Sequence, residues 1–122
     1  MFQLVNGIRE EYGLPAFKQL DTLTAVAQLR ASELPYRFDA THSRPDGSGC
    51  ETAFFELGLT SFYGIGENIA SGQRTAQRVV EGWMNSPGHR ANILDSSFEY
   101  MGVGVCYQDG VYYWSQDFYT PW

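Results

Sequence analysis

The sequence predicts an α+β fold in which helices cover both faces of a small antiparallel sheet. The C-terminal third has the pattern of a β-hairpin, because Asp109-Gly110 is a two-residue turn signal between runs rich in Val, Tyr, Trp and Phe. Earlier segments place apolar residues at helical spacing instead. Since both faces of the hairpin carry residues that need cover, helices on its two sides complete the predicted arrangement.

Length and composition indicate a single domain over residues 1–122, large enough to form its own core. Fourteen acidic and eight basic side chains give a net charge of −6. This charge disfavours nucleic acid and anionic membranes as partners, because both attract basic surfaces. No apolar run approaches the roughly 18 residues that would predict a transmembrane segment.

Two helices are predicted near the N-terminus, separated by Gly13-Leu14-Pro15. Asp21 has the residue type of an N-cap for the second helix, and Pro35 marks its end. The apolar stripes of the two helices are Phe2, Val5, Ile8 and Tyr12, and Leu23, Val26, Ala27, Ala31 and Leu34. Arg30 and Glu33, three residues apart, are predicted to form a solvated ion pair worth a few tenths of a kcal/mol.

His42 is predicted at the entry of a loop over residues 39–49, which is rich in polar and turn-forming residues. A short helix over Glu51–Leu57 follows. Residues 65–70 then alternate as in a strand, which places Glu67 on the same face as two isoleucines. Glu67 is therefore either exposed at a strand end or buried with a partner, because an unpaired buried carboxylate is too costly to keep.

A further helix is predicted to begin after an N-cap at Thr75. Its apolar stripe consists of Ala76, Val79, Val80, Trp83 and Met84. Ser86-Pro87 then indicates a new helix, with serine as the cap and proline in the first turn. His89 would lie in the first turn of this short helix, which is predicted to end near Leu94.

The turn at Asp109-Gly110 sets the register of the hairpin, so that Val105 faces Trp114. One face of the hairpin then carries large apolar residues, and the other carries Gly102 and Gly104. Those glycines would let a helix pack closely on their face. They do not indicate a phosphate loop, because the third glycine and the following helix are missing.

His42, Glu67 and His89 have the clearest chemical potential in the chain. Two imidazoles and a carboxylate are a usual ligand set for zinc, and an open fourth position holding water would allow hydrolysis. The wide spacing of the histidines shows no metal motif, and histidines bonded to backbone and to a glutamate are an equally common arrangement. A nucleophilic Cys50 or Ser43 has little support, since neither lies in a recognisable catalytic motif.

Cys50 and Cys106 are the candidate pair for one intramolecular disulfide, which would close a long loop and add a few kcal/mol of stability. We expect this bridge if the protein is exported. The chain begins directly in a helical pattern, so the signal peptide of an exported protein would already have been removed.

Several short segments spread over nearly the whole chain form the pattern of a known family. They include His42-Ser43-Arg44-Pro45-Asp46-Gly47, Gly66-Glu67-Asn68-Ile69-Ala70, Trp83-Met84-Asn85-Ser86-Pro87-Gly88-His89-Arg90 and Gly102-Val103-Gly104. In these segments the chain resembles bacterial members of the CAP superfamily, also called SCP-like extracellular proteins. The resemblance implies a three-layer α/β/α sandwich with a central antiparallel sheet, an extracellular or cell-surface location, and a cleft that can bind zinc or another divalent cation.

By this resemblance, His42 and His89 match the two cleft histidines that can hold the metal, and Glu67 matches the cleft glutamate. Many eukaryotic relatives have a second glutamate where this chain has Ser86. Ser86 is therefore a candidate cleft residue, and the substitution weakens any four-residue catalytic site. Eukaryotic relatives also carry cysteine-rich modules that are missing from this chain, so the ion-channel and sterol-export roles of some relatives are not transferred.

The resemblance favours a binding domain whose cleft holds a divalent metal or small ligand without turnover. One alternative is a metal-dependent hydrolase or peptidase with Glu67 as the general base. Another is a lipid or sterol carrier with a groove lined by the apolar residues of segment 54–64, although these residues are better interpreted as core. The expected partner is a small ligand or an extracellular protein, and the sequence predicts no oligomeric state.

Overall fold

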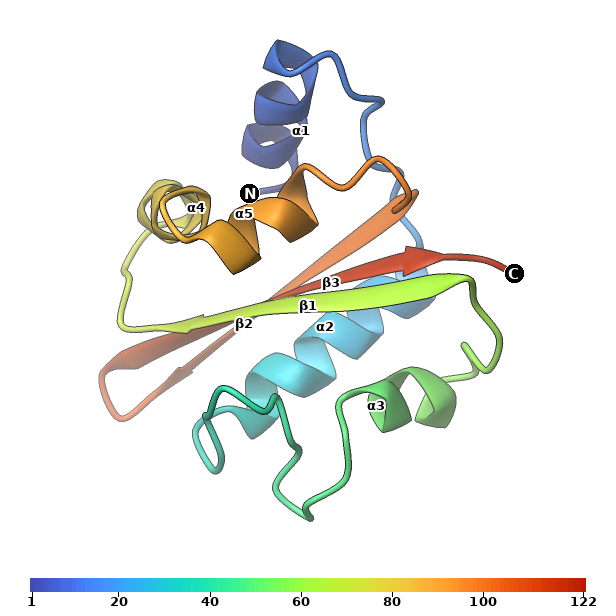
Figure 1. Ribbon diagram of the computed structural model, residues 1–122. Coiled ribbons are helices and arrows are strands. Elements are labelled where there is room, and N and C mark those ends of the chain that lie inside the picture. The colour runs from blue at the N-terminus through green and yellow to red at the C-terminus, as the bar shows by residue number, and fades with distance from the viewer.

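The fold has three layers, with a three-stranded sheet between two layers of helices (Figure 1). A computed structural model of the protein describes residues 1–122. Helices α1, α4 and α5 lie on one side of the sheet, and α2 and α3 lie on the other. In chain order the elements are α1 (Phe2–Glu11), α2 (Asp21–Glu33), α3 (Glu51–Glu56), β1 (Gly64–Ser71), α4 (Ala76–Met84), α5 (Pro87–Ile93), β2 (Tyr100–Gln108) and β3 (Val111–Thr120). The predicted α+β class and the α/β/α sandwich are both confirmed.

The sheet is antiparallel throughout, with strand order β1-β3-β2. The hairpin has the predicted register, in which Val105 pairs with Trp114. Asp109 and Gly110 both have positive φ, at 52° and 82°, as a type I′ turn requires. Strand β1 pairs with β3 along its whole length and forms one edge of the sheet. This edge carries Glu67 and lies between the two helical layers.

A separate apolar core fills the space on each side of the sheet. The larger core joins α1, α4 and α5 to the sheet; its members are Val5, Phe17, Ala70, Val79, Val80, Trp83, Ile93, Phe98, Met101, Trp114 and Phe118. The smaller core lies under α2 and α3; its members are Leu23, Val26, Ala53, Phe54 and Tyr119. Because both faces of the sheet bury apolar side chains, helices are needed on both sides.

The two hairpin glycines allow α2 to pack unusually close to the sheet. A Cβ atom built on Gly102 would lie 2.5 Å from the carbonyl oxygen of Leu23, and one on Gly104 would lie 2.3 Å from that of Ala27. Real Cβ atoms do not approach backbone so closely, and any side chain here would push α2 outward. The predicted packing role of these glycines is therefore confirmed.

The helix boundaries agree with the sequence analysis except at one cap. Asp21 is the first residue of α2 and not its N-cap; the N-cap position is occupied by Leu20, without a side-chain hydrogen bond. A carboxylate in the first turn still interacts favourably with the helix dipole, which explains why the residue type suits this end. Thr75 is the predicted N-cap of α4, and its hydroxyl accepts a hydrogen bond from the Arg78 N–H.

The candidate disulfide is not formed, because Cys50 and Cys106 are both free. Cys50 precedes α3 and lies near the carboxylates of Glu67 and Asp117.

Candidate functional site

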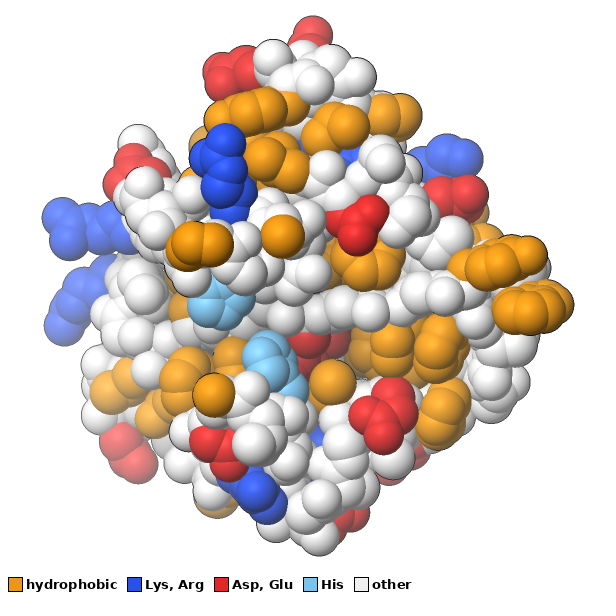
Figure 2. Space-filling model, viewed as in Figure 1, with side chains coloured by type: hydrophobic (Ala, Val, Ile, Leu, Met, Phe, Trp, Pro, Cys, Tyr) orange, Lys and Arg blue, Asp and Glu red, His pale blue; other side chains and the backbone are white.

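The two histidines face a common cleft at the β1 edge of the sheet. His42 lies in the loop after α2, and His89 lies in α5 in the opposite helical layer. Figure 2 looks onto this edge and shows both imidazoles, the only two in the chain, on either side of a hollow. The hollow has a volume of about 560 Å³, and its lining residues are Phe38, Asp39, Ala40, His42, Ile69 and His89.

The position of His42 depends on a strained backbone and three hydrogen bonds. Its φ of 58° is in the left-handed region, which non-glycine residues rarely adopt and which is frequent at functional sites. The His42 N–H donates to the carbonyl of Asp39 at 3.2 Å, and its own carbonyl accepts from Arg30 Nη2 at 3.3 Å. The ring nitrogen Nδ1 lies 2.9 Å from Glu67 Oε1. Backbone and ring are therefore both held in place.

The position of His89 follows from the break between α4 and α5. Pro87 is the first residue of α5, so His89 lies in the first turn as predicted. The backbone carbonyl of His89 accepts a hydrogen bond from the Asn68 side chain at 3.1 Å, which ties α5 to β1. No hydrogen bond is formed by either ring nitrogen of His89. The imidazole is therefore available to a ligand in the cleft.

Glu67 is buried beneath His42 and is paired with Arg30. Glu67 exposes only 7 % of its surface to solvent, and Arg30 is fully buried. Arg30 donates from Nε to Glu67 Oε2 and from Nη2 to Glu67 Oε1, both at 2.9 Å. Of the two predicted environments of Glu67, the structure has the buried one with a partner.

The predicted role of Arg30 is wrong. The sequence predicts a solvated pair with Glu33, and the contact with Glu33 does exist at 2.9 Å. Arg30 nevertheless has no exposure to solvent, and its main partner is Glu67. The physical reason is its position on α2: residue 30 follows Val26 by four positions and therefore lies on the buried stripe of the helix.

The hydrogen bonds to Glu67 keep it ionised. Burial by itself would raise the pKa of Glu67, but the bonds from His42 and Arg30 outweigh burial and lower this pKa to about 2. Burial also opposes the charged form of Arg30, yet its bonds to Glu67 raise its pKa above the ordinary arginine value. The pair is thus an ionised carboxylate and a guanidinium that compensate each other inside the protein.

Asp117 belongs to the same buried cluster and was not identified from the sequence. It lies opposite Glu67 in the β1-β3 pairing and has no exposure to solvent. Burial and the negative charge of Glu67 raise the pKa of Asp117 well above its usual range. Its Oδ1 accepts a hydrogen bond from the Ser115 hydroxyl at 2.6 Å. The sequence does contain one indication of this role: side chains alternate along β3, and this alternation places Ser115 and Asp117 on the face of the sheet that contacts α2.

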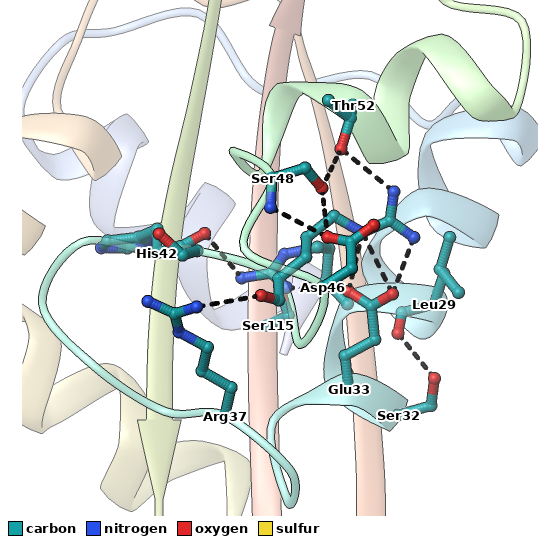
Figure 3. Close-up of polar contacts among 12 residues, drawn as sticks. Leu29, Ser32, Glu33, Arg37, His42, Asp46, Ser48, Thr52 and Ser115 are labelled. Atoms are coloured by element: carbon teal, nitrogen blue, oxygen red, sulfur yellow. Dashed lines mark hydrogen bonds and ion pairs between the residues drawn. The ribbon is translucent and has the colours of Figure 1, made fainter.

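A second group of ion pairs fixes the loop that carries His42. Arg44 donates to both carboxylate oxygens of Glu33 at 2.7–3.1 Å and to the Thr52 hydroxyl at 3.1 Å. Figure 3 shows Glu33 on α2 and Thr52 on α3 directed towards this loop. Because Glu33 also contacts Arg30, the loop, α2 and the buried cluster form one continuous polar network.

Ser86 is the remaining predicted cleft residue. It occupies the N-cap position of α5, but its hydroxyl forms no capping hydrogen bond. It is half-buried and is separate from the residues that line the hollow. His42, Glu67 and His89 are therefore brought together by the fold, whereas a role of Ser86 in ligand binding stays a prediction.

Comparison with known proteins identifies the family. The sequence model of the Cysteine-rich secretory protein family, CAP, matches residues 2–118. The chain belongs to the CAP family. Among curated proteins, this CAP domain is 34% identical over 116 residues to the "Uncharacterized protein YkwD" of Bacillus subtilis. The aligned residues cover 95% of the chain and 44% of YkwD. The CAP domain therefore spans less than half of that relative.

Solved structures show the same fold. An extracellular protein containing a SCP domain from Bacillus anthracis superposes with a TM-score of 0.86 at 28% identity, covering 98% of this CAP domain and 38% of that chain. An outer surface protein from Borrelia burgdorferi superposes with a TM-score of 0.88 at 24% identity, covering 99% of this CAP domain and 90% of that chain. Both relatives are extracellular or surface proteins by description. In the present CAP domain, no helix combines the length and apolar character needed to cross a membrane.

Proposed function

We propose that this CAP domain is an extracellular binding module without turnover, and that its cleft takes a divalent cation or a small ligand between His42 and His89. The observation that supports this function is that both imidazoles line one hollow while Glu67 is engaged by Arg30. The extracellular location rests on the relatives, which are described as extracellular or outer-surface proteins.

The two imidazoles are suited to contribute two ligands to a divalent ion. His42 uses Nδ1 to contact Glu67, so Nε2 is its free nitrogen, in the carboxylate–histidine arrangement common around metals. Burial and the nearby His42 lower the pKa of His89, which favours the neutral ring that coordinates metal. No group of three His, Cys, Asp or Glu side chains is close enough to complete a site. The remaining positions would be filled by the ligand and water, and the ion would act as a Lewis acid towards them.

The hydrolase alternative is less favoured, because Glu67 is a poor general base. A base works best when its pKa is near the working pH, whereas the pKa of Glu67 is about 2. Both oxygens of Glu67 also accept hydrogen bonds from Arg30. Taking up a proton at this carboxylate would weaken a buried ion pair, which is costly.

The lining of the cleft also limits the kind of ligand. Half of the lining residues are apolar: Phe38, Ala40 and Ile69. A fitting ligand is therefore small, with an apolar part against this wall and a polar part near the imidazoles. The lipid-carrier alternative has less support. Within segment 54–64, Phe54 is fully buried in the core, and only Tyr63 and Gly64 line a cavity, which has a volume of about 180 Å³.

Calorimetric titration with zinc tests the proposed function. We expect the wild-type domain to bind one zinc ion, and His42→Ala and His89→Ala each to weaken binding at least about tenfold, because each removes one of two protein ligands. Cys106→Ser is a matched control, because it removes a soft ligand outside the cleft and should leave the affinity unchanged.

Peptide hydrolysis, measured with and without zinc, distinguishes binding from catalysis. The binding module predicts no turnover in either condition. Zinc-dependent cleavage that Glu67→Gln abolishes would instead establish the hydrolase, and zinc affinity unchanged in both histidine variants would refute the proposed site.

A further inference from the structure

We propose that Arg30 is the positioning residue of the cleft: through Glu67 it holds the ring of His42 in one tautomer, with Nδ1 protonated and Nε2 free for the ligand. Arg30 does not line the hollow, and it lies beneath His42 without exposure to solvent. Its effect on a ligand is therefore indirect, through the orientation and the hydrogen bonding of His42.

The first step is the fork between Arg30 and Glu67. A guanidinium donates two parallel hydrogen bonds to a carboxylate, and here Nε and Nη2 each contact a different oxygen of Glu67 at 2.9 Å. This geometry fixes the plane of the carboxylate. Glu67 can then present to His42 only an oxygen that accepts a hydrogen bond.

The second step is the consequence for the imidazole. A neutral histidine has one ring nitrogen that donates and one that accepts. Since Glu67 Oε1 is an acceptor, Nδ1 of His42, 2.9 Å away, carries the hydrogen. Nε2 then carries the lone pair. Because Arg30 Nη2 also reaches the His42 carbonyl, at 3.3 Å, the same guanidinium restrains the backbone of this strained residue.

No other arginine or lysine forms an ion pair with Glu67. The two arginines near His42 in the chain have other partners: Arg44 is paired with Glu33 and Glu56, and Arg37 is paired with Asp39. The other neighbour of Glu67 is Asp117, a buried carboxyl group that lies opposite it on β3 and brings no positive charge. Arg30 is thus the only guanidinium that pairs with Glu67.

This arrangement also indicates the ligand class, an inference that rests on the proposed function. A cleft that presents an imidazole lone pair at His42 and an imidazole without protein partners at His89 favours a metal ion or a hydrogen-bond donor. The Asp39 carboxylate in the same lining is paired with Arg37 at 3.0 Å, so the preference rests on the two imidazoles.

Long-range proton–nitrogen NMR of the imidazole rings tests the inference without any ligand. Spectra are recorded near pH 8, where an ordinary imidazole is neutral. With only two histidines, His89→Ala assigns the signals of His42. We expect a single tautomer protonated at Nδ1 in the wild type, and both tautomers in Arg30→Met. Arg78→Met is the matched control, because it removes an exposed guanidinium on α4, outside the His42 loop and the buried cluster, and should preserve the single tautomer.

The outcomes separate positioning from a general structural role. A folded Arg30→Met that keeps the single Nδ1-protonated form would overturn the inference, as would a wild-type His42 protonated at Nε2. If Arg30→Met does not fold, Arg30→Lys decides: lysine keeps the charge but lacks the fork, so the second tautomer should appear, and its absence overturns the inference.

Zinc affinity gives an independent measurement of the same effect. We expect folded Arg30→Met to bind zinc about 10–100-fold more weakly than the wild type, as is typical when support behind a metal-binding histidine is lost. An affinity equal to that of the wild type contradicts the positioning role. If the wild type binds no zinc, the proposed metal site is refuted. The NMR measurement of the His42 tautomer then still tests the positioning role of Arg30.

Discussion

Replacement of Arg30 by methionine is expected to lower the free energy of unfolding by about 3–5 kcal/mol. The substitution removes the only guanidinium that pairs with Glu67, and it leaves that carboxylate buried beside Asp117. An uncompensated buried charge must either be exposed or take up a proton, and both routes cost stability. Arg30 is therefore expected to be among the least replaceable side chains of the fold.

Urea denaturation followed by tryptophan fluorescence measures this loss. Arg78→Met is the matched control: Arg78 is exposed on α4, so its replacement should change the free energy of unfolding by no more than about 0.5 kcal/mol. The double variant Arg30→Met with Glu67→Leu should recover part of the loss, because both members of the ion pair are then removed. A loss below about 1 kcal/mol in the single variant would show that the buried pair is not needed.

Gly104→Ala is expected to destabilise the domain by about 3 kcal/mol, because overpacking against a rigid neighbour is costly. The new methyl group would lie 2.3 Å from the Ala27 carbonyl oxygen and 2.5 Å from its carbon. These are backbone atoms of α2, so no side-chain rotation can relieve the clash. The helix would have to move away from the sheet, and with it Arg30.

Thermal unfolding of Gly104→Ala is best compared with that of Gly7→Ala. Gly7 lies in α1, and a Cβ atom there would have no neighbour within 4 Å. Its replacement should stabilise the domain by about 0.4–1 kcal/mol, since alanine restricts the unfolded chain. If both variants had the same stability, the close approach of α2 would not be a constraint on the fold.

Most of the fold follows from short-range patterns in the sequence. The Asp109-Gly110 turn sets a hairpin register that the structure confirms, and the restart at Pro87 places His89 correctly. Such features depend on residues close in the chain. The predicted cap of α2 is wrong by one residue, because Asp21 also suits the first turn of a helix.

The buried part of the site is harder to predict, because it depends on contacts between distant elements. The sequence pairs Arg30 with the nearby Glu33, yet its main partner is on β1. Periodicity does contain a signal: Arg30 and Arg9 both lie on the apolar stripes of their helices, and both are buried. Arg9 donates at 2.8 Å to the carbonyl of Ile93, which its sequence neighbours could not have revealed.

The cysteines illustrate the same limit. Their number and the expected export favour a bridge, but Cys50 and Cys106 are both free in the structure. Burial raises the pKa of the Cys50 thiol to about 12, so this cysteine is also protected from reaction.

Anomalous diffraction at the zinc edge, from crystals grown with the metal, tests the cleft most directly. We expect one peak within coordination distance of His42 Nε2 and a ring nitrogen of His89, with both oxygens of Glu67 still bonded to Arg30. A peak elsewhere on the protein, or a Glu67 that has left Arg30 to coordinate the ion, would contradict this description of the site.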